Sequence, residues 1–189
     1  MKPLLIFLFS ATLALAETYQ VRPTGDSRLA LTVEKTGLYH GKKHLFLFEK
    51  YQGTLQFDAQ HPETSKIEVT IESSSAVCKD DWVSAKDLKS ILETTFDDML
   101  AVKKYPTMRF VSIAIKPLGG DRFEAQGMLT IRDIAKPVVV AVQMEPSMRL
   151  TGSARIKLTD YKLKPPSAIL GAIGTKDEMT LNFVISATK

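Results

Sequence analysis

The sequence predicts a mainly β domain whose strands close into an antiparallel barrel, with one helix near a barrel mouth. Three observations lead to this fold class: segments in which apolar and polar residues alternate, turn residues between those segments, and a single stretch with helical spacing. Alternation puts the apolar side chains of a strand on one face. That pattern is typical of antiparallel sheets, because buried parallel strands are apolar throughout. Closure of the sheet would leave no exposed edge strands.

The N-terminal residues predict a signal peptide that covers residues 1–16. Lys2 supplies a positive charge, the segment 4–15 is almost wholly apolar, and Ala14 and Ala16 are small residues suited to cleavage. The segment is shorter than the roughly 20 apolar residues of a membrane-spanning helix. We therefore expect a periplasmic or secreted protein in which residues 17–189 form one barrel domain.

Five segments show the alternation most clearly. In each of them apolar residues occupy every second position over at least part of the segment: 28–34, 54–57, 66–72, 122–131 and 178–186. Turn-forming residues separate them at 23–26, 58–62, 117–121 and 160–174. A barrel of about eight strands holds either its own side chains or a small ligand. The alternation alone does not distinguish a filled barrel from a hollow one.

Residues 84–102 predict the one helix. Ser84 can cap its N-terminus, with Asp87 three residues later as a capping partner. Apolar residues then recur at helical spacing: Leu88, Ile91, Leu92, Phe96, Met99 and Leu100. Tyr105 and Pro106 end the segment, because a residue before proline disfavours the helical region.

Charge and cysteine content exclude some classes of protein. The formal net charge is +4, and no basic run is interleaved with aromatic residues, so nucleic acid is not favoured as a partner. The mild positive charge suits transient contact with a membrane surface. Cys78 is the single cysteine, so an exported domain would depend on its core for stability. We interpret Cys78 as a small residue at the end of a strand rather than a reactive thiol, because no histidine or second cysteine lies nearby in the sequence.

The sequence does not offer a clear catalytic or metal-binding set. His40 and His44 could form a metal pair, but two lysines lie between them, which favours a solvated loop. The adjacent Asp80 and Asp81 do not face each other, so their position before the helix explains them better than acid–base catalysis. Trp82 is interpreted as a packing anchor. We expect a protein that is not an enzyme and that has no metal or cofactor.

Several segments resemble the YceI-like family when they are taken in order. The segments 104–110 (KYPTMRF), 123–131 (FEAQGMLTI) and 136–138 (KPV) are similar to its central signature, and 26–33 and 53–58 resemble its first long strand and next hairpin. The resemblance implies an extended lipocalin-like antiparallel barrel, in which some members bind polyisoprenoid or similar long-chain lipids without catalysis. Carried over to this sequence, it implies an apolar lining that comprises Leu29, Leu31, Val33, Leu55, Phe57, Phe110, Leu129 and Ile131.

Together these observations predict an exported, non-catalytic binding protein that holds a long apolar ligand, an isoprenoid or another lipid, inside the barrel. The alternative is an accessory module with a filled barrel that binds a protein partner. In that case the segment 39–48, with Phe46 and Phe48, would supply the contact surface. The internal volume of the barrel distinguishes the two hypotheses.

Overall fold

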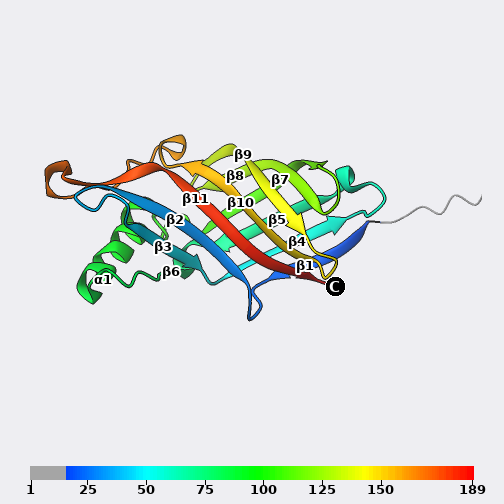
Figure 1. Cartoon of the computed structure of the whole chain (residues 1–189), viewed down its shortest axis with the longest axis horizontal. Coiled ribbons are helices and arrows are strands. Elements are labelled where there is room, and N and C mark those ends of the chain that lie inside the picture. Colours follow the sequence, from blue (N-terminus) through cyan, green and yellow to red (C-terminus); the bar gives the residue numbers. More distant parts are fainter. Residues whose placement is uncertain (1–15) are drawn as a thin grey trace, which may run out of the picture.

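A computed structural model describes residues 16–189, so the expected signal peptide lies outside the described residues except for Ala16. The described chain forms one antiparallel sheet of eleven strands, with a single α-helix (Figure 1). The strands are β1 (Glu17–Arg22), β2 (Arg28–Gly37), β3 (Lys43–Phe48), β4 (Tyr51–Phe57), β5 (Lys66–Glu72), β6 (Ala76–Cys78), β7 (Thr107–Pro117), β8 (Arg122–Ile131), β9 (Ile134–Met144), β10 (Arg149–Lys157) and β11 (Ile173–Thr188). The helix, α1, spans Ala85–Glu93.

The sheet closes because its first and last strands pair. Gln20 of β1 lies opposite Thr188 of β11, while the preceding part of β11 pairs with β2 and β10. Three pairs of consecutive strands each occupy a single position in the barrel wall: β1 with β2, β3 with β4, and β5 with β6. The eleven strands therefore occupy eight positions around a closed barrel. The structure confirms the predicted fold class.

The alternating segments all lie in strands, namely β2, β4, β5, β8 and β11. In β8, buried and less buried residues alternate from Phe123 to Ile131, so one face is turned toward the interior. The strands that alternation did not single out carry apolar residues on both faces or are short. The run Val138, Val139 and Val140 in β9 is an example, since only the middle residue is exposed.

The helix begins at the predicted position, but its α-helical part ends at Glu93, before the end of the predicted segment 84–102. Ser84 caps α1: its Oγ accepts a hydrogen bond from the Asp87 N–H (3.2 Å) and donates one to the Asp87 carboxylate (2.7 Å). After Glu93 the backbone continues as a π-helical turn, Thr94–Met99, in which the Leu100 N–H bonds the Thr95 carbonyl five residues earlier. Within residues 16–189, no helix has both the length and the apolar character needed to cross a membrane.

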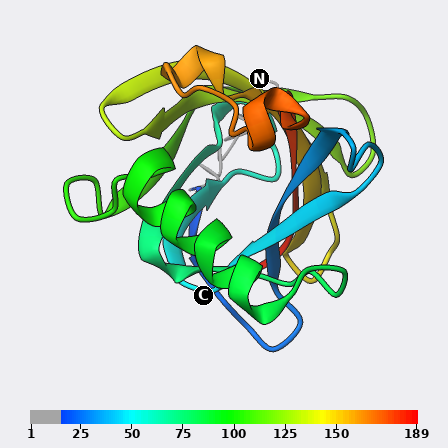
Figure 2. The ribbon, with the colours of Figure 1, turned by 90° about the vertical axis from the view of Figure 1, so that its left-hand side faces the viewer.

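The helix lies at one end of the barrel. There β6 pairs only with β3 among the described strands, whereas β5 pairs with β7, so the wall divides between β6 and β7. The segment between Cys78 and Thr107, which contains α1, connects the two sides of this division. Figure 2 looks onto this end, with the green helix lying across the opening. This placement confirms the expected helix near a barrel mouth.

Candidate ligand-binding site

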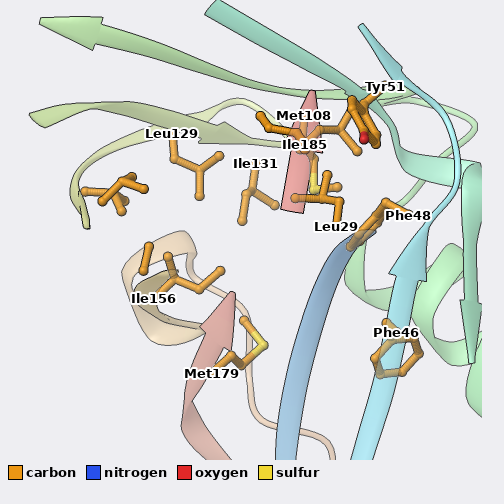
Figure 3. Close-up of a cluster of buried hydrophobic side chains, with 14 of the residues drawn as sticks. Leu29, Phe46, Phe48, Tyr51, Met108, Leu129, Ile131, Ile156, Met179 and Ile185 are labelled. Carbon is orange, nitrogen blue, oxygen red and sulfur yellow. The ribbon is translucent and has the colours of Figure 1, made fainter. Parts of the chain in front are cut away.

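A cavity of about 330 Å³ lies inside the barrel at the end that α1 covers. Pockets that bind small molecules usually have volumes from roughly 300 Å³ upward. The wall is apolar and comes from most strands of the barrel: Leu31, Val33, Phe46, Phe48, Ile71, Met108, Leu129, Ile131, Ile156, Leu158, Met179 and Leu181. Figure 3 shows part of this wall, with Phe46, Leu129 and Met179 on different strands, together with neighbouring core residues such as Leu29.

The helical segment forms the roof of this cavity. Ile91 of α1 and Met99 and Leu100 of the π-helical end face it. Thr95 also lines the cavity, and its hydroxyl donates to the Ile91 carbonyl (2.7 Å), so this polar group is satisfied locally. Of the apolar residues predicted for the helix, Ile91, Met99 and Leu100 therefore line the cavity, while Leu92 and Phe96 pack against the core.

The predicted lining residues divide into two groups. Leu31, Val33, Leu129 and Ile131 line the cavity. Leu29 and Leu55 are buried in the core outside it, and Phe57 and Phe110 pack against that core. Sequence reasoning missed other lining residues, and the largest of these are Phe46, Phe48, Met108, Ile156 and Met179.

Phe110 lies away from the cavity for a local reason. Its ring packs over Gly127 of the neighbouring strand, where an added Cβ would come within 2.5 Å of the ring carbon Cζ. Only glycine allows this close approach, so the ring lies along the wall. The sequence showed that Gly127 interrupts the apolar side chains of its strand, but it did not show that the Phe110 ring fills the space above this glycine.

Lys35 places a cation on the cavity wall. Its ammonium group contacts the Thr175 hydroxyl (3.4 Å), and none of the ion pairs formed by residues 16–189 includes it. Burial lowers the pKa of Lys35 below its usual value, because the charged form loses water. The cavity is therefore an apolar chamber with a positive group on its wall.

His44, Cys78 and Asp80 also meet at this end of the barrel. Phe46 of β3 lies opposite Cys78 of β6 in the strand register, and continuing that register by two residues brings His44 opposite Asp80. The His44 Nδ1 and Asp80 Oδ2 atoms are 2.5 Å apart, and the Leu45 N–H donates to Asp80 Oδ1 (2.8 Å). Both side chains are almost inaccessible to solvent, with exposed fractions of 10% and 1%.

The buried pair corrects two expectations. His44 does not lie in a solvated loop, although His40 does lie in an exposed turn, because His44, Phe46 and Phe48 alternate inward along β3. Asp80 is not a solvated residue before the helix, because it is the buried hydrogen-bond partner of His44. The two residues are 36 positions apart, so no local spacing could have linked them.

Trp82 covers the pair from outside. Its ring stacks on the His44 ring with centroids 5.2 Å apart and an angle of 25°, and its Nε1–H donates to the Lys43 carbonyl (3.0 Å). The Tyr39 ring packs in turn against the Trp82 ring. Trp82 therefore packs as the sequence predicted.

The structure does not support the partner-binding surface expected at residues 39–48, because its two phenylalanines are not exposed. Phe46 and Phe48 are buried and face the cavity, so they cannot contact a partner. The alternative hypothesis also required a filled barrel, and the cavity contradicts that requirement.

The Cys78 thiol is poorly suited to nucleophilic chemistry. Burial and the neighbouring Asp80 carboxylate raise its pKa to about 12. The nucleophilic form of cysteine is the thiolate, so this thiol is protonated at neutral pH. Cys78 is the last residue of β6, which agrees with its interpretation as a strand-end residue.

Comparison with known proteins gives the family of this barrel. Residues 19–187 match the YceI-like domain family. A UPF0312 protein of Pseudomonas savastanoi is 30% identical over 132 residues, and the alignment covers 63% of this chain and 63% of that protein. The chain thus spans somewhat less than two thirds of the length of that relative. A UPF0312 protein of Pseudomonas aeruginosa is 29% identical over 167 residues, 83% of this chain and 82% of the relative.

Solved structures share the fold. BcnA of Burkholderia cenocepacia superposes with a TM-score of 0.67 at 21% identity, over 86% of this chain and 96% of that chain. A polyisoprenoid binding domain from Saccharophagus degradans, implicated in plant cell wall breakdown, superposes with a TM-score of 0.60 at 13% identity, over 92% and 98%. At these identities the likeness shows the fold alone.

Proposed function

The chain belongs to the family of YceI-like domains, and from this premise we propose that it is an exported, non-catalytic carrier of one long apolar ligand, an isoprenoid or another lipid. The observation that carries the proposal is the apolar cavity of about 330 Å³ under α1. A core built only for stability would be close-packed, because empty apolar volume destabilises a domain. The polyisoprenoid-binding domain among the structural neighbours supports the same ligand class.

The polar groups around the cavity support one orientation for the ligand. Lys35, Thr175 and Ser167 line it together with the apolar wall. A volume near the lower end for ligand pockets encloses only part of a long chain. We therefore place the hydrocarbon tail against Leu129 and Ile131, and a polar or anionic head near Lys35.

The loops beside the mouth support transient contact with a membrane surface. Leu38, Ile169 and Leu170 are exposed, and their loops are joined by a hydrogen bond from the Leu38 N–H to the Ala172 carbonyl (3.0 Å). Exposed apolar side chains at the entrance would lower the cost of passing a lipid between bilayer and barrel. We expect Leu170→Asp to reduce co-sedimentation with anionic phospholipid vesicles. Ile113→Asp, which changes an exposed apolar residue of β7, should leave it unchanged.

The central test is the ligand itself. Protein isolated from its own host should release a stoichiometric long-chain lipid on organic extraction, identified by mass spectrometry. Repeated extraction without such a lipid would refute the carrier. Export is tested separately: N-terminal sequencing of the same preparation should begin at Glu17, and an intact Met1 would refute cleavage.

A further inference from the structure

Three different donor atoms meet beside the cavity: an imidazole nitrogen of His44, the sulfur of Cys78 and a carboxylate oxygen of Asp80. All three atoms lie within 4.8 Å of one another. Nothing in the carrier function needs them together, since a lipid tail is held by apolar contacts. We propose that these residues form a binding site for a divalent transition-metal ion of the zinc type.

The spacing of the donor atoms fits such an ion. Zinc binds nitrogen, oxygen and sulfur at about 2.0–2.3 Å in tetrahedral geometry, which puts ligand atoms about 3.3–3.8 Å apart. The donors of His44, Cys78 and Asp80 lie within 4.8 Å of one another, so side-chain movements of about 1 Å would bring them to that spacing. Three protein ligands leave one tetrahedral position for water or another small ligand.

The charges also fit. Cys78 would give up its proton when the ion binds, so its thiolate and the Asp80 carboxylate would supply two negative charges, and His44 would bind as a neutral imidazole. A divalent cation makes this centre neutral overall, which removes the cost of burying unpaired charge. His44 is the only ion-pair partner of Asp80 within residues 16–189, so no lysine or arginine competes for the carboxylate.

The surroundings hold the donors in place. The Leu45 N–H fixes Asp80 Oδ1, and such outer hydrogen bonds commonly orient metal-binding carboxylates. Trp82 stacks on His44 and limits access of water to the ring. The mixed set of nitrogen, sulfur and oxygen favours zinc over magnesium or calcium, which prefer oxygen ligands alone.

The test measures Zn²⁺ affinity by competition with a chromogenic chelator. His44→Ala and Cys78→Ser should each weaken Zn²⁺ binding by more than about 100-fold, beyond the roughly 10–100-fold typical of lost outer-shell partners. The matched controls are His40→Ala and His61→Ala, since both histidines are exposed. These controls should bind as the parent does. Equal losses in the control variants, or no loss in His44→Ala and Cys78→Ser, would overturn the site.

A second readout does not depend on the stability of the variants. Co²⁺ added to the parent protein should produce a near-ultraviolet thiolate-to-cobalt charge-transfer band, because sulfur ligation is what generates it. Cys78→Ser should lack the band while keeping the circular dichroism spectrum of the parent. A parent protein without the band would refute ligation by Cys78. Lipid extraction from Cys78→Ser should give the same lipid as the parent, which separates this site from the carrier function.

Discussion

Leu31→Trp should block the cavity without disturbing the barrel. Leu31 lines the cavity from β2, and a tryptophan there turns an indole ring into the space that a ligand would fill. The ring displaces roughly two or three methylene groups of a bound chain, at about 0.8 kcal/mol each. The loss of about 1.6–2.4 kcal/mol corresponds to a Kd that is roughly 15- to 60-fold weaker.

The matched control for this change is Leu47→Trp on the paired strand β3. Leu47 is also half-buried, but it alternates with the inward Phe46 and Phe48 and faces outward. The assay is fluorescence titration with N-phenylnaphthylamine, an apolar probe that brightens in a dry site, with a thermal melt for each variant. Probe affinity should fall in Leu31→Trp and stay at the parent value in Leu47→Trp. Equal affinity in the two variants would refute the assignment of the cavity as the apolar binding site.

Three further predictions concern stability in urea unfolding. Asp80→Ala should lower the free energy of unfolding by about 3–5 kcal/mol, because it leaves His44 and a backbone N–H buried without their partner. Asp81 is exposed, so Asp81→Ala should change the free energy of unfolding by no more than about 0.5 kcal/mol. Equal losses of stability in Asp80→Ala and Asp81→Ala would contradict the buried pair of His44 and Asp80. Leu55→Ala should lower the free energy of unfolding by about 3–5 kcal/mol, and Leu129→Ala should lower it by less. The two leucines are equally buried, at 6% and 7% exposed, but only Leu129 faces the cavity, so its side chain has fewer packing contacts to lose. The reverse order would count against an empty cavity. Tyr161→Phe should be neutral or stabilising by up to about 1 kcal/mol, because the buried hydroxyl has no hydrogen-bond partner among the described residues. Burial raises the pKa of Tyr161 to about 12. The unfolded chain therefore loses this proton first, and parental stability should fall between pH 10 and 12 more steeply than that of Tyr161→Phe. A loss of stability in Tyr161→Phe at neutral pH would show that the hydroxyl is bonded.

The strands that could be predicted from the sequence are those with one face exposed to solvent. Along β8, Phe123, Ala125 and Leu129 face inward between polar residues, so the period of two is plain in the sequence. β3 carries apolar residues on both faces, because Leu45 and Leu47 are half-buried on the outside of the wall. A strand of this kind has no alternation to detect.

The candidate site was predictable only in part. Leu31 and Ile131 follow from alternation and the family resemblance, and both line the cavity. The volume of the cavity depends on how rings pack, as Phe110 does over Gly127, and the period of a sequence does not encode this. The meeting of His44 with Asp80 depends on the register between β3 and β6, two strands separated by β4, β5 and their turns.

The pairing of β1 with β11 sets the order in which the barrel can be completed. Gln20 and its partner Thr188 lie near opposite ends of the described residues, so almost the whole described chain separates them. No closed wall can exist before the final strand is available, and pairings between such distant segments form slowly. The end of β11 is therefore the seam of the barrel, because it joins β1 to the strand that already pairs with β2 and β10.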